Sequence, residues 1–165
     1  MKTKTLTLQL NDVFDEEFRL LAIYCDEEDY RMAFLLNYFK EMEFQRTASI
    51  ILPKISASFS VFEFIDSTNY RTWNLIYNYC LKDEKVTKKK STQSFGLFSE
   101  VETRNEKPVF LIKEFSKARF LLKIEAEESE AFYDSFLNSL KDIPQIYTCE
   151  WIDLNRIKNM NLLHF

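Results

Sequence analysis

The chain has 165 residues, a formal net charge of −4 and a pI near 5.2. One glycine and three prolines exclude collagen-like and Gly/Pro-rich disordered proteins, and a lone Gly96 excludes glycine-rich phosphate loops. The acidic balance argues against attraction of the whole surface to nucleic acid. Because 46% of the residues are hydrophobic and 16% aromatic, we expect a single globular domain over residues 1–165.

The first predicted elements are a strand over residues 18–25 and a helix over residues 27–41. Asp26 is the expected N-cap, and three acids follow it in the positive first turn. The four acids of residues 26–29 also raise the possibility of a hard-cation site, but adjacent helical positions point apart, which favours capping. Spacing of i, i+3, i+4, i+7 predicts a buried helix stripe of Met32, Leu35, Leu36 and Phe39.

The middle of the chain reads as strands joined by short connections, which favour antiparallel pairing. A hairpin turn is expected at residues 66–69, and residues 94–102 are expected to pair with residues 109–113. Residues 82–93 are polar and rich in lysine, so we expect an exposed loop there. In residues 119–125, alternation predicts that Arg119, Lys123 and Glu125 point outward. The predicted strands cover residues 56–66, 70–80, 94–102, 109–113 and 119–125.

A second helix is predicted over residues 129–141, and Pro144 prevents its continuation into the last strand, residues 145–153. The fold class is therefore α+β: an antiparallel sheet of about five to seven strands with two main helices on one face. A ferredoxin-like or ACT-like variant is the nearest analogy. The predicted shared core consists of Leu36, Phe39, Phe120, Leu122, Phe136 and Leu140.

The outer side of the first helix carries apolar residues as well, which is unusual for a helix that covers one face of a sheet. Tyr30, Phe34 and Asn37 are the candidate partner-binding residues, and Ala33 lies beside them. A second protein or a second copy of the chain could bind there. The chain's own C-terminal tail, residues 161–165, is the other candidate cover for this side.

A different class of partner is suggested by the lysine-rich loop. Lysines on an exposed loop can contact phosphates, which makes an RNA- or ribosome-associated accessory factor the alternative function. The same lysines could simply keep the loop soluble. The candidate RNA-binding residues are Lys85, Lys88, Lys89 and Lys90.

The sequence offers little for catalysis. His164 is the single histidine and lies next to the C-terminus, a poor position for a general base. Cys25, Cys80 and Cys149 are widely spaced, which favours buried reduced thiols and a cytoplasmic location. No catalytic residue, metal site or cofactor is predicted, and a carboxylate-dependent enzyme is the second alternative. The longest apolar run has six residues, so no membrane span is expected.

Five segments stand out in chain order: EDYRMAFLLN (28–37), ASFSVFEF (57–64), TWNLI (72–76), FLLKIE (120–125) and IPQIYTCEWID (143–153). Together they resemble the IPExxxVDY family, a family of uncharacterised bacterial proteins of about this length. In the matching stretch only Ile112 and Glu114 keep the identities of the namesake motif. The family has no established activity, so the resemblance implies no catalytic residues; a strand–turn–strand corner is the interpretation that tolerates the replacements.

We therefore expect a non-enzymatic cytoplasmic domain that binds another macromolecule, in the first place a protein.

Overall fold

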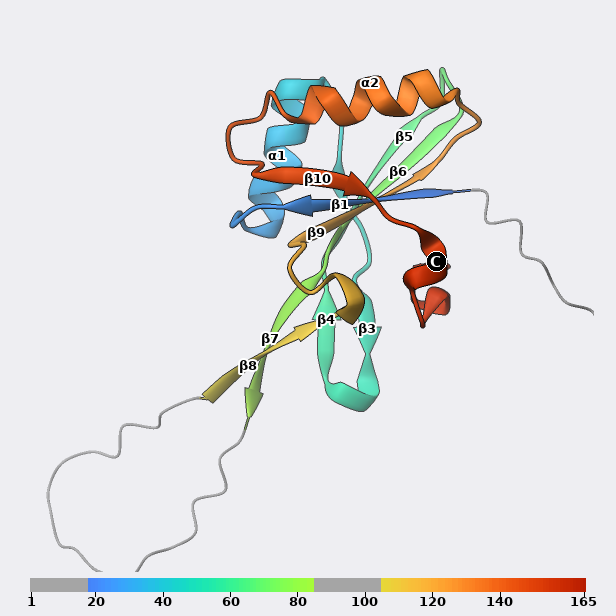
Figure 1. The fold of residues 1–165 in the computed structure, drawn as a ribbon. Helices are drawn as coiled ribbons and strands as arrows, with labels where there is room; N and C mark the ends of the chain where they lie inside the picture. Colours follow the sequence, from blue (N-terminus) through green and yellow to red (C-terminus); the bar gives the residue numbers. More distant parts are fainter. Residues whose placement is uncertain (1–17, 85–104) are drawn as a thin grey trace, which may run out of the picture.

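The computed structural model describes residues 18–84 and 105–165 and has at its centre a six-stranded, fully antiparallel sheet (Figure 1). Its spatial order is β10-β1-β9-β6-β5-β2. Two helices, α1 (Asp29–Lys40) and α2 (Glu130–Leu140), accompany it, so the predicted α+β class is confirmed. The strands are β1 (Arg19–Tyr24), β2 (Gln45–Arg46), β5 (Val61–Asp66), β6 (Arg71–Tyr77), β9 (Phe120–Glu125) and β10 (Thr148–Trp151).

Both helices cover the same face of the sheet, as predicted. Alternation along the strands turns every second side chain toward them, for example Leu21 of β1, Leu75 of β6 and Leu122 of β9. From the helices, Leu36 and Leu140 complete this cluster and are fully buried. Four of the six predicted core residues, Leu36, Phe120, Leu122 and Leu140, are buried together there.

The opposite face of the sheet is covered as well. Leu20 of β1 and Leu121 of β9 pack there under the hairpin of β3 (Ile50–Leu52) and β4 (Ala57–Phe59). The C-terminal 3₁₀ turns η3 (Leu154–Arg156) and η4 (Met160–Leu163) close the same side. This second layer explains why β1 reads as an unbroken apolar run rather than an alternating one.

This second layer makes the expectation for Lys123 wrong. Lys123 points away from the helices, yet it is only 3% exposed, because the C-terminal segment covers it. Its ammonium binds Glu125 at 2.6 Å and lies about 5 Å from the rings of Phe18 and Phe165. A buried charge with a carboxylate partner and aromatic faces avoids the full desolvation cost.

The predicted strand over residues 70–80 is divided at Asn78. After this residue the chain leaves the sheet as β7 (Tyr79–Glu84), which pairs with β8 (Asn105–Phe110) in a separate two-stranded arm (Figure 1). The fully buried Asn78 amide donates to the carbonyls of Phe115 and Ala118 and accepts from the N–H of Ile112 at 2.8 Å. This amide thus holds the turn η2 (Lys113–Phe115) between the arm and β9, and the stretch is a strand–turn–strand corner.

The arm also corrects the predicted pairing of residues 94–102 with residues 109–113. Asn105 and Glu106 belong to β8, whose partner is β7 rather than residues 94–102. The described part of the lysine-rich segment begins as strand, since β7 ends at Glu84. The predicted strand 94–102 and loop residues 85–93 lie outside the described residues.

The ends of the elements follow local chemistry. The Ser129 side chain accepts a hydrogen bond from the Phe132 N–H and caps α2 as Ser N-caps do. The predicted cap Asp26 is wrong: α1 begins after Glu28, which makes no side-chain cap, while Asp26 accepts from the Tyr147 hydroxyl at 2.6 Å. Between β5 and β6, Asp66 accepts from the N–H groups of the turn, as expected for a hairpin.

The connection order differs from the ferredoxin-like analogy. Three long strands, β5, β6 and β9, lie between α1 and α2 along the chain, so β9 runs antiparallel to β1. A split βαβ unit would require two parallel strands there. None of the described helices is long and apolar enough to cross a membrane.

Candidate functional site

The outer side of α1 exposes a row of aromatic side chains. Tyr30, Phe34 and Tyr38 follow one another at every fourth position and are 66%, 52% and 70% exposed. We call these three residues the aromatic stripe. The rings of Phe34 and Tyr38 stack with centroids 6.1 Å apart and planes at 14°. The prediction that Tyr30 and Phe34 are exposed is confirmed, and the stripe extends one turn further than predicted.

One charged side chain lies beside the stripe. The Arg31 guanidinium lies over the Phe34 ring, 5.2 Å from its centroid. Among the described residues, Arg31 forms no hydrogen bond or ion pair, so its charge is available to a partner. Glu41 follows the last helical turn with a left-handed backbone, φ of 53°, and lines a cavity next to α2.

Two other residues predicted on the outer side face inward. Ala33 is 4% exposed and belongs to the helix-facing core. Asn37 accepts a hydrogen bond from the Phe44 N–H at 2.8 Å and donates to the Phe44 carbonyl at 3.2 Å. Asn37 therefore fastens the chain after α1 to the helix, and its role in partner binding stays a prediction.

Phe39 is the reverse case. It was predicted in the core, but it is 40% exposed and packs edge-on against Tyr38, with ring centroids 5.1 Å apart. Phe39 lies in the last turn of α1, and its ring packs on the Tyr38 ring rather than on the sheet, which leaves it partly exposed. Phe39 thus adds apolar surface beside the stripe.

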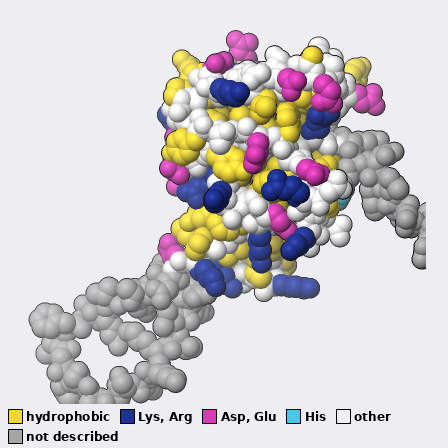
Figure 2. All heavy atoms as spheres, viewed as in Figure 1, with side chains coloured by type: hydrophobic (Ala, Val, Ile, Leu, Met, Phe, Trp, Pro, Cys, Tyr) yellow, Lys and Arg dark blue, Asp and Glu magenta, His cyan; other side chains and the backbone are white. Residues whose placement is uncertain are grey.

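The C-terminal tail does not cover α1. Leu163 is fully buried in the cluster on the opposite face of the sheet, and the His164 ring lies edge-on to Phe18 at 6.0 Å. The tail and the stripe are thus on different sides of the sheet, so the second proposed cover for α1 is wrong. Figure 2 shows one face of the molecule, on which exposed hydrophobic side chains alternate with acidic and basic ones.

The predicted RNA-binding lysines, Lys85, Lys88, Lys89 and Lys90, lie outside the described residues. The arm that leads to them places Lys82 of β7 directly opposite Lys107 of β8. The next pair along the arm is Asp83 opposite Glu106, so the arm has no excess of positive charge over β7 and β8.

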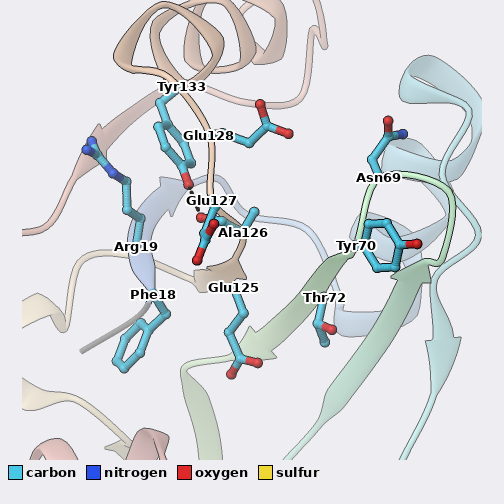
Figure 3. A pocket seen from close by; sticks show the side chains of 10 residues that line it. All are labelled: Phe18, Arg19, Asn69, Tyr70, Thr72, Glu125, Ala126, Glu127, Glu128 and Tyr133. Carbon is cyan, nitrogen blue, oxygen red and sulfur yellow. Dashed lines mark hydrogen bonds between the residues drawn. The ribbon is translucent and has the colours of Figure 1, made fainter. Parts of the chain in front are cut away.

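The larger cavity, about 810 Å³, opens at the end of the sheet beside the start of α2 (Figure 3). Among its lining carboxylates, Glu125 is bound to Lys123 and Glu128 to Arg71. Arg19, on its wall, pairs with Glu130 and lies over the Tyr133 ring at 4.2 Å. Most charges here are engaged in ion pairs that hold elements together, and the described part of the chain has no group of three or more His, Cys, Asp or Glu residues that could hold a metal ion.

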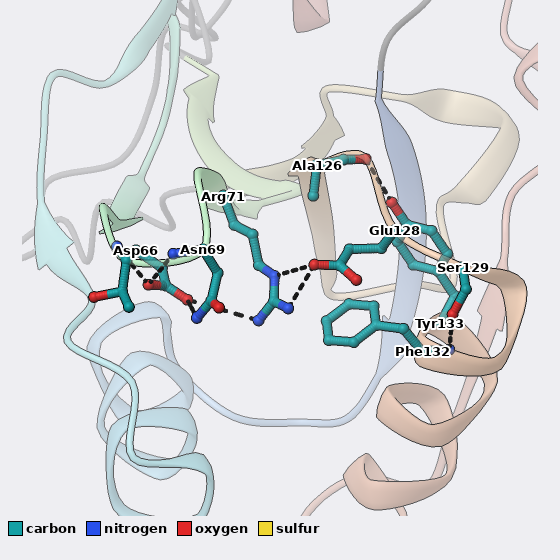
Figure 4. Close-up of polar contacts among 9 residues, drawn as sticks. Asp66, Asn69, Arg71, Ala126, Glu128, Ser129, Phe132 and Tyr133 are labelled. Atoms are coloured by element: carbon teal, nitrogen blue, oxygen red, sulfur yellow. Dashed lines mark hydrogen bonds and ion pairs between the residues drawn. The ribbon is translucent and has the colours of Figure 1, made fainter.

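A smaller cavity, about 370 Å³, lies between the end of α1, α2 and strands β5 and β6. Its walls include Phe64, Trp73, Phe132 and Phe136. Arg71 bridges Asp66 and Glu128 at its edge, with the guanidinium 4.3 Å from the Phe132 ring centroid (Figure 4). This network joins the β5–β6 turn to the start of α2, which is a structural role.

The displaced pKa values do not favour acid–base or thiol chemistry. Hydrogen bonds from Asn69 lower the pKa of Asp66. Burial alone would raise the pKa of Asp29, but hydrogen bonds from Ser60, the Tyr30 N–H and Arg46 hold it below its ordinary value. Burial raises the pKa of the Cys25 thiol to about 11, which makes the reactive thiolate scarce at neutral pH.

No family model, no curated protein and no solved structure matches the chain. The resemblance to the IPExxxVDY family stays a prediction. The case for the stripe therefore depends on this chain's own geometry. Sequence reasoning missed Tyr38, although its position four residues after Phe34 was the available signal, and it missed Arg31, whose guanidinium lies over the Phe34 ring.

Proposed function

We propose that this chain is a non-enzymatic protein-binding domain whose docking surface is the aromatic stripe of α1. The observation that carries the proposal is the exposure of Tyr30, Phe34 and Tyr38 on consecutive turns, with Arg31 over one of the rings. Tyr and Arg are enriched in interface hot spots, and such anchors contribute about 2 kcal/mol or more each.

The support beneath the stripe suits a docking surface. Met32 and Leu36 hold the inner side of α1 on the sheet and are fully buried. Asn37 ties the following segment to the helix through both of its hydrogen bonds to Phe44. A helix fixed in this way presents its outer side chains with little ordering left to do on binding, which favours affinity.

A crosslinking experiment tests the proposal. We would place a photoreactive benzoylphenylalanine at position 34 of the full chain, irradiate native cells, and identify the adducts by mass spectrometry. The matched control carries the same group at Tyr70, which is 89% exposed in the β5–β6 turn. The expected result is a discrete protein adduct from position 34 and none from position 70. Equal adduct patterns from both positions would contradict the proposal.

RNA binding through the lysine-rich segment is the second candidate, suggested by the run of Lys88, Lys89 and Lys90 in the sequence. Its test is an RNA titration at increasing salt with Lys88, Lys89 and Lys90 changed together to Ala. If the segment contacts phosphates, affinity falls and the salt dependence becomes shallower, since each neutralised phosphate contributes to the slope. An unchanged affinity and slope would reject this candidate.

We also propose a cytoplasmic location. The three cysteines are free thiols, with Cys25 and Cys149 buried and Cys80 partly buried. Free thiols fit a reducing compartment. Fractionation of native cells with an antibody against the chain tests this proposal.

A further inference from the structure

We propose that the smaller cavity, about 370 Å³, binds a small planar aromatic carboxylate. The cavity lies between the end of α1, helix α2 and strands β5 and β6. Its volume falls within the range of about 300–1,000 Å³ that is typical of pockets for small molecules. No residue of the aromatic stripe lines it, so this site is separate from the docking surface proposed above.

The walls of the cavity favour a flat aromatic ligand. Four aromatic side chains from three elements line it: Phe64 on β5, Trp73 on β6, and Phe132 and Phe136 on α2. The centroid of the Trp73 ring lies 4.8 Å from that of Phe136 and 6.4 Å from that of Phe132, at interplanar angles of 54° and 58°. Aromatic rings attract one another in tilted and offset arrangements at centroid separations of about 4.5–7 Å. A flat ring bound in the cavity gains such contacts from more than one wall.

A buried hydrogen-bond donor belongs to one of these walls. Trp73 is only 2% exposed, and its indole N–H has no hydrogen-bond partner among the described residues. A buried Trp N–H usually finds a partner, and one without a partner loses the hydrogen bond that it made to water in the unfolded chain. The other buried side-chain atoms without partners in the described part of the chain, on Arg119, Gln145 and Trp151, belong to residues that do not line this cavity. Because the Trp73 N–H is shielded from solvent, an acceptor atom of a ligand reaches it when the partly buried Phe136 ring shifts.

Lys40 brings a positive charge to the same cavity. Its side chain is 14% exposed, and its ammonium lies 3.7 Å from the Asp142 carboxylate, which is too far for a hydrogen bond. Lys40 forms no hydrogen bond with any residue in the described ranges. Because a charge taken out of water is costly unless it is hydrogen-bonded, a ligand carboxylate that accepts from this ammonium stabilises the complex.

The other charges at the cavity favour a single negative charge on the ligand. Arg71 is already engaged, because its guanidinium bridges Asp66 and Glu128 (Figure 4). Asp66 and the exposed Glu41 also line the cavity and would repel a doubly charged group such as a phosphate ester. One carboxylate on the ligand matches the charge of Lys40.

Calorimetric titration of the full chain with 2-naphthoate tests the site. We expect saturable binding of one molecule per chain, with a Kd below about 1 mM. Two related probes each lack one feature: 2-naphthylmethanol keeps the planar ring without the charge, and cyclohexanecarboxylate keeps the charge without the planar ring. Each should bind at least about tenfold more weakly than 2-naphthoate.

Nuclear magnetic resonance of the native chain locates the bound probe. The chain has two tryptophans, Trp73 and Trp151, and Trp151→Phe assigns their indole N–H resonances. Binding of 2-naphthoate should shift the Trp73 resonance and leave that of Trp151 nearly unchanged. A shift of the Trp151 resonance alone would overturn the proposal.

Substitutions at the walls come with matched controls. Lys40→Met removes the charge and should weaken binding of 2-naphthoate about tenfold while leaving that of 2-naphthylmethanol unchanged. Its control is Lys54→Met, at an exposed position between β3 and β4. Ser135→Trp places a large ring at the cavity from α2 and should abolish binding, whereas Asp134→Trp adds the same ring at a neighbouring exposed position that does not line the cavity. Both controls should bind 2-naphthoate like the native chain.

The proposal is overturned if 2-naphthoate shows no saturable binding up to about 10 mM, or if the three probes bind equally. It is also overturned if Lys40→Met and Ser135→Trp melt like the native chain and still bind 2-naphthoate with native affinity. If either variant melts much earlier, the shift of the Trp73 resonance in the native chain decides the question.

Discussion

The two helices cover the same face of one sheet but use their aromatic residues differently. On α2, Phe136 packs on Trp73 with ring centroids 4.8 Å apart, and Tyr133 is buried and donates its hydroxyl to the Ala126 carbonyl. On α1, Tyr30, Phe34 and Tyr38 face solvent. Folding accounts for the aromatic side chains of α2 and leaves those of α1 without a role, which is why the docking surface is assigned to α1.

The largest expected effect is a loss of stability from truncating the side chains by which each helix packs on the sheet, and this loss should be similar for α1 and α2. Leu36→Ala on α1 and Leu140→Ala on α2 each remove a fully buried side chain and should lower the free energy of unfolding by about 2–5 kcal/mol. Urea unfolding followed by circular dichroism measures both. A loss below about 1 kcal/mol at Leu36 would mean that α1 is held more loosely than α2 and would weaken the contrast.

Truncation of aromatic side chains should lower the stability of the protein on α2 but not on α1. Phe136→Ala on α2 should cost about 2–3 kcal/mol, somewhat less than the ~3–5 kcal/mol of a fully buried Phe, because part of its ring is exposed. The double change Phe34→Ala and Tyr38→Ala on α1 should alter stability by no more than about 0.5 kcal/mol per site.

The same α1 double variant should lose its protein partner, because it removes the rings at the centre of the proposed docking surface. Thermal melts and a pull-down from native cell lysate, both with the same preparation, measure stability and partner binding. A variant that melts much earlier would show that the stripe stabilises the folded chain, and one that captures the same partner as the native chain would remove the stripe from the docking surface.

The N-terminus of α2 has a side-chain cap, whereas that of α1 has none. Ser129→Ala removes the side-chain acceptor that caps α2 and should cost about 0.5–2 kcal/mol. Glu28→Ala at the start of α1 removes no capping hydrogen bond, so we expect a change within about 0.5 kcal/mol. Equal losses in the two variants, measured by urea unfolding, would contradict this difference.

The sequence predicted those features whose determining residues lie close together in the chain, and missed those that depend on distant residues. The second helix was predicted well because its cap and its apolar stripe are adjacent in the chain. The break at Asn78 was not, since its partners Phe115 and Ala118 are about 40 residues away in the sequence. Lys123 was expected to face solvent because alternation cannot show that the C-terminal segment covers the second face.

The candidate site followed the same rule. Periodicity identified the outer side of α1 and correctly placed Tyr30 and Phe34 at the surface. It could not show that Asn37 turns back to bind the Phe44 backbone, nor that the C-terminal tail covers the other side of the sheet. Helical spacing alone did contain Tyr38 and Arg31, so the pattern of the stripe could have been found from the sequence.

The smallest expected effect is a pH dependence at the start of α1. The hydrogen bonds to Asp29 lower its pKa in the folded protein, so the folded state binds this proton less readily than the unfolded chain. Its contribution to stability is therefore fully present above the unfolded carboxyl pKa of about 3.9 and is lost as the pH falls through the lower folded pKa. Asp29→Asn removes the titration, so the difference in unfolding free energy between native chain and variant should shrink between pH 6 and about pH 3. Urea unfolding at both pH values measures it, and Asp134→Asn, at an exposed position of α2, is the control. A difference that stays constant or grows on acidification would show that Asp29 does not stabilise the start of α1 through its charge.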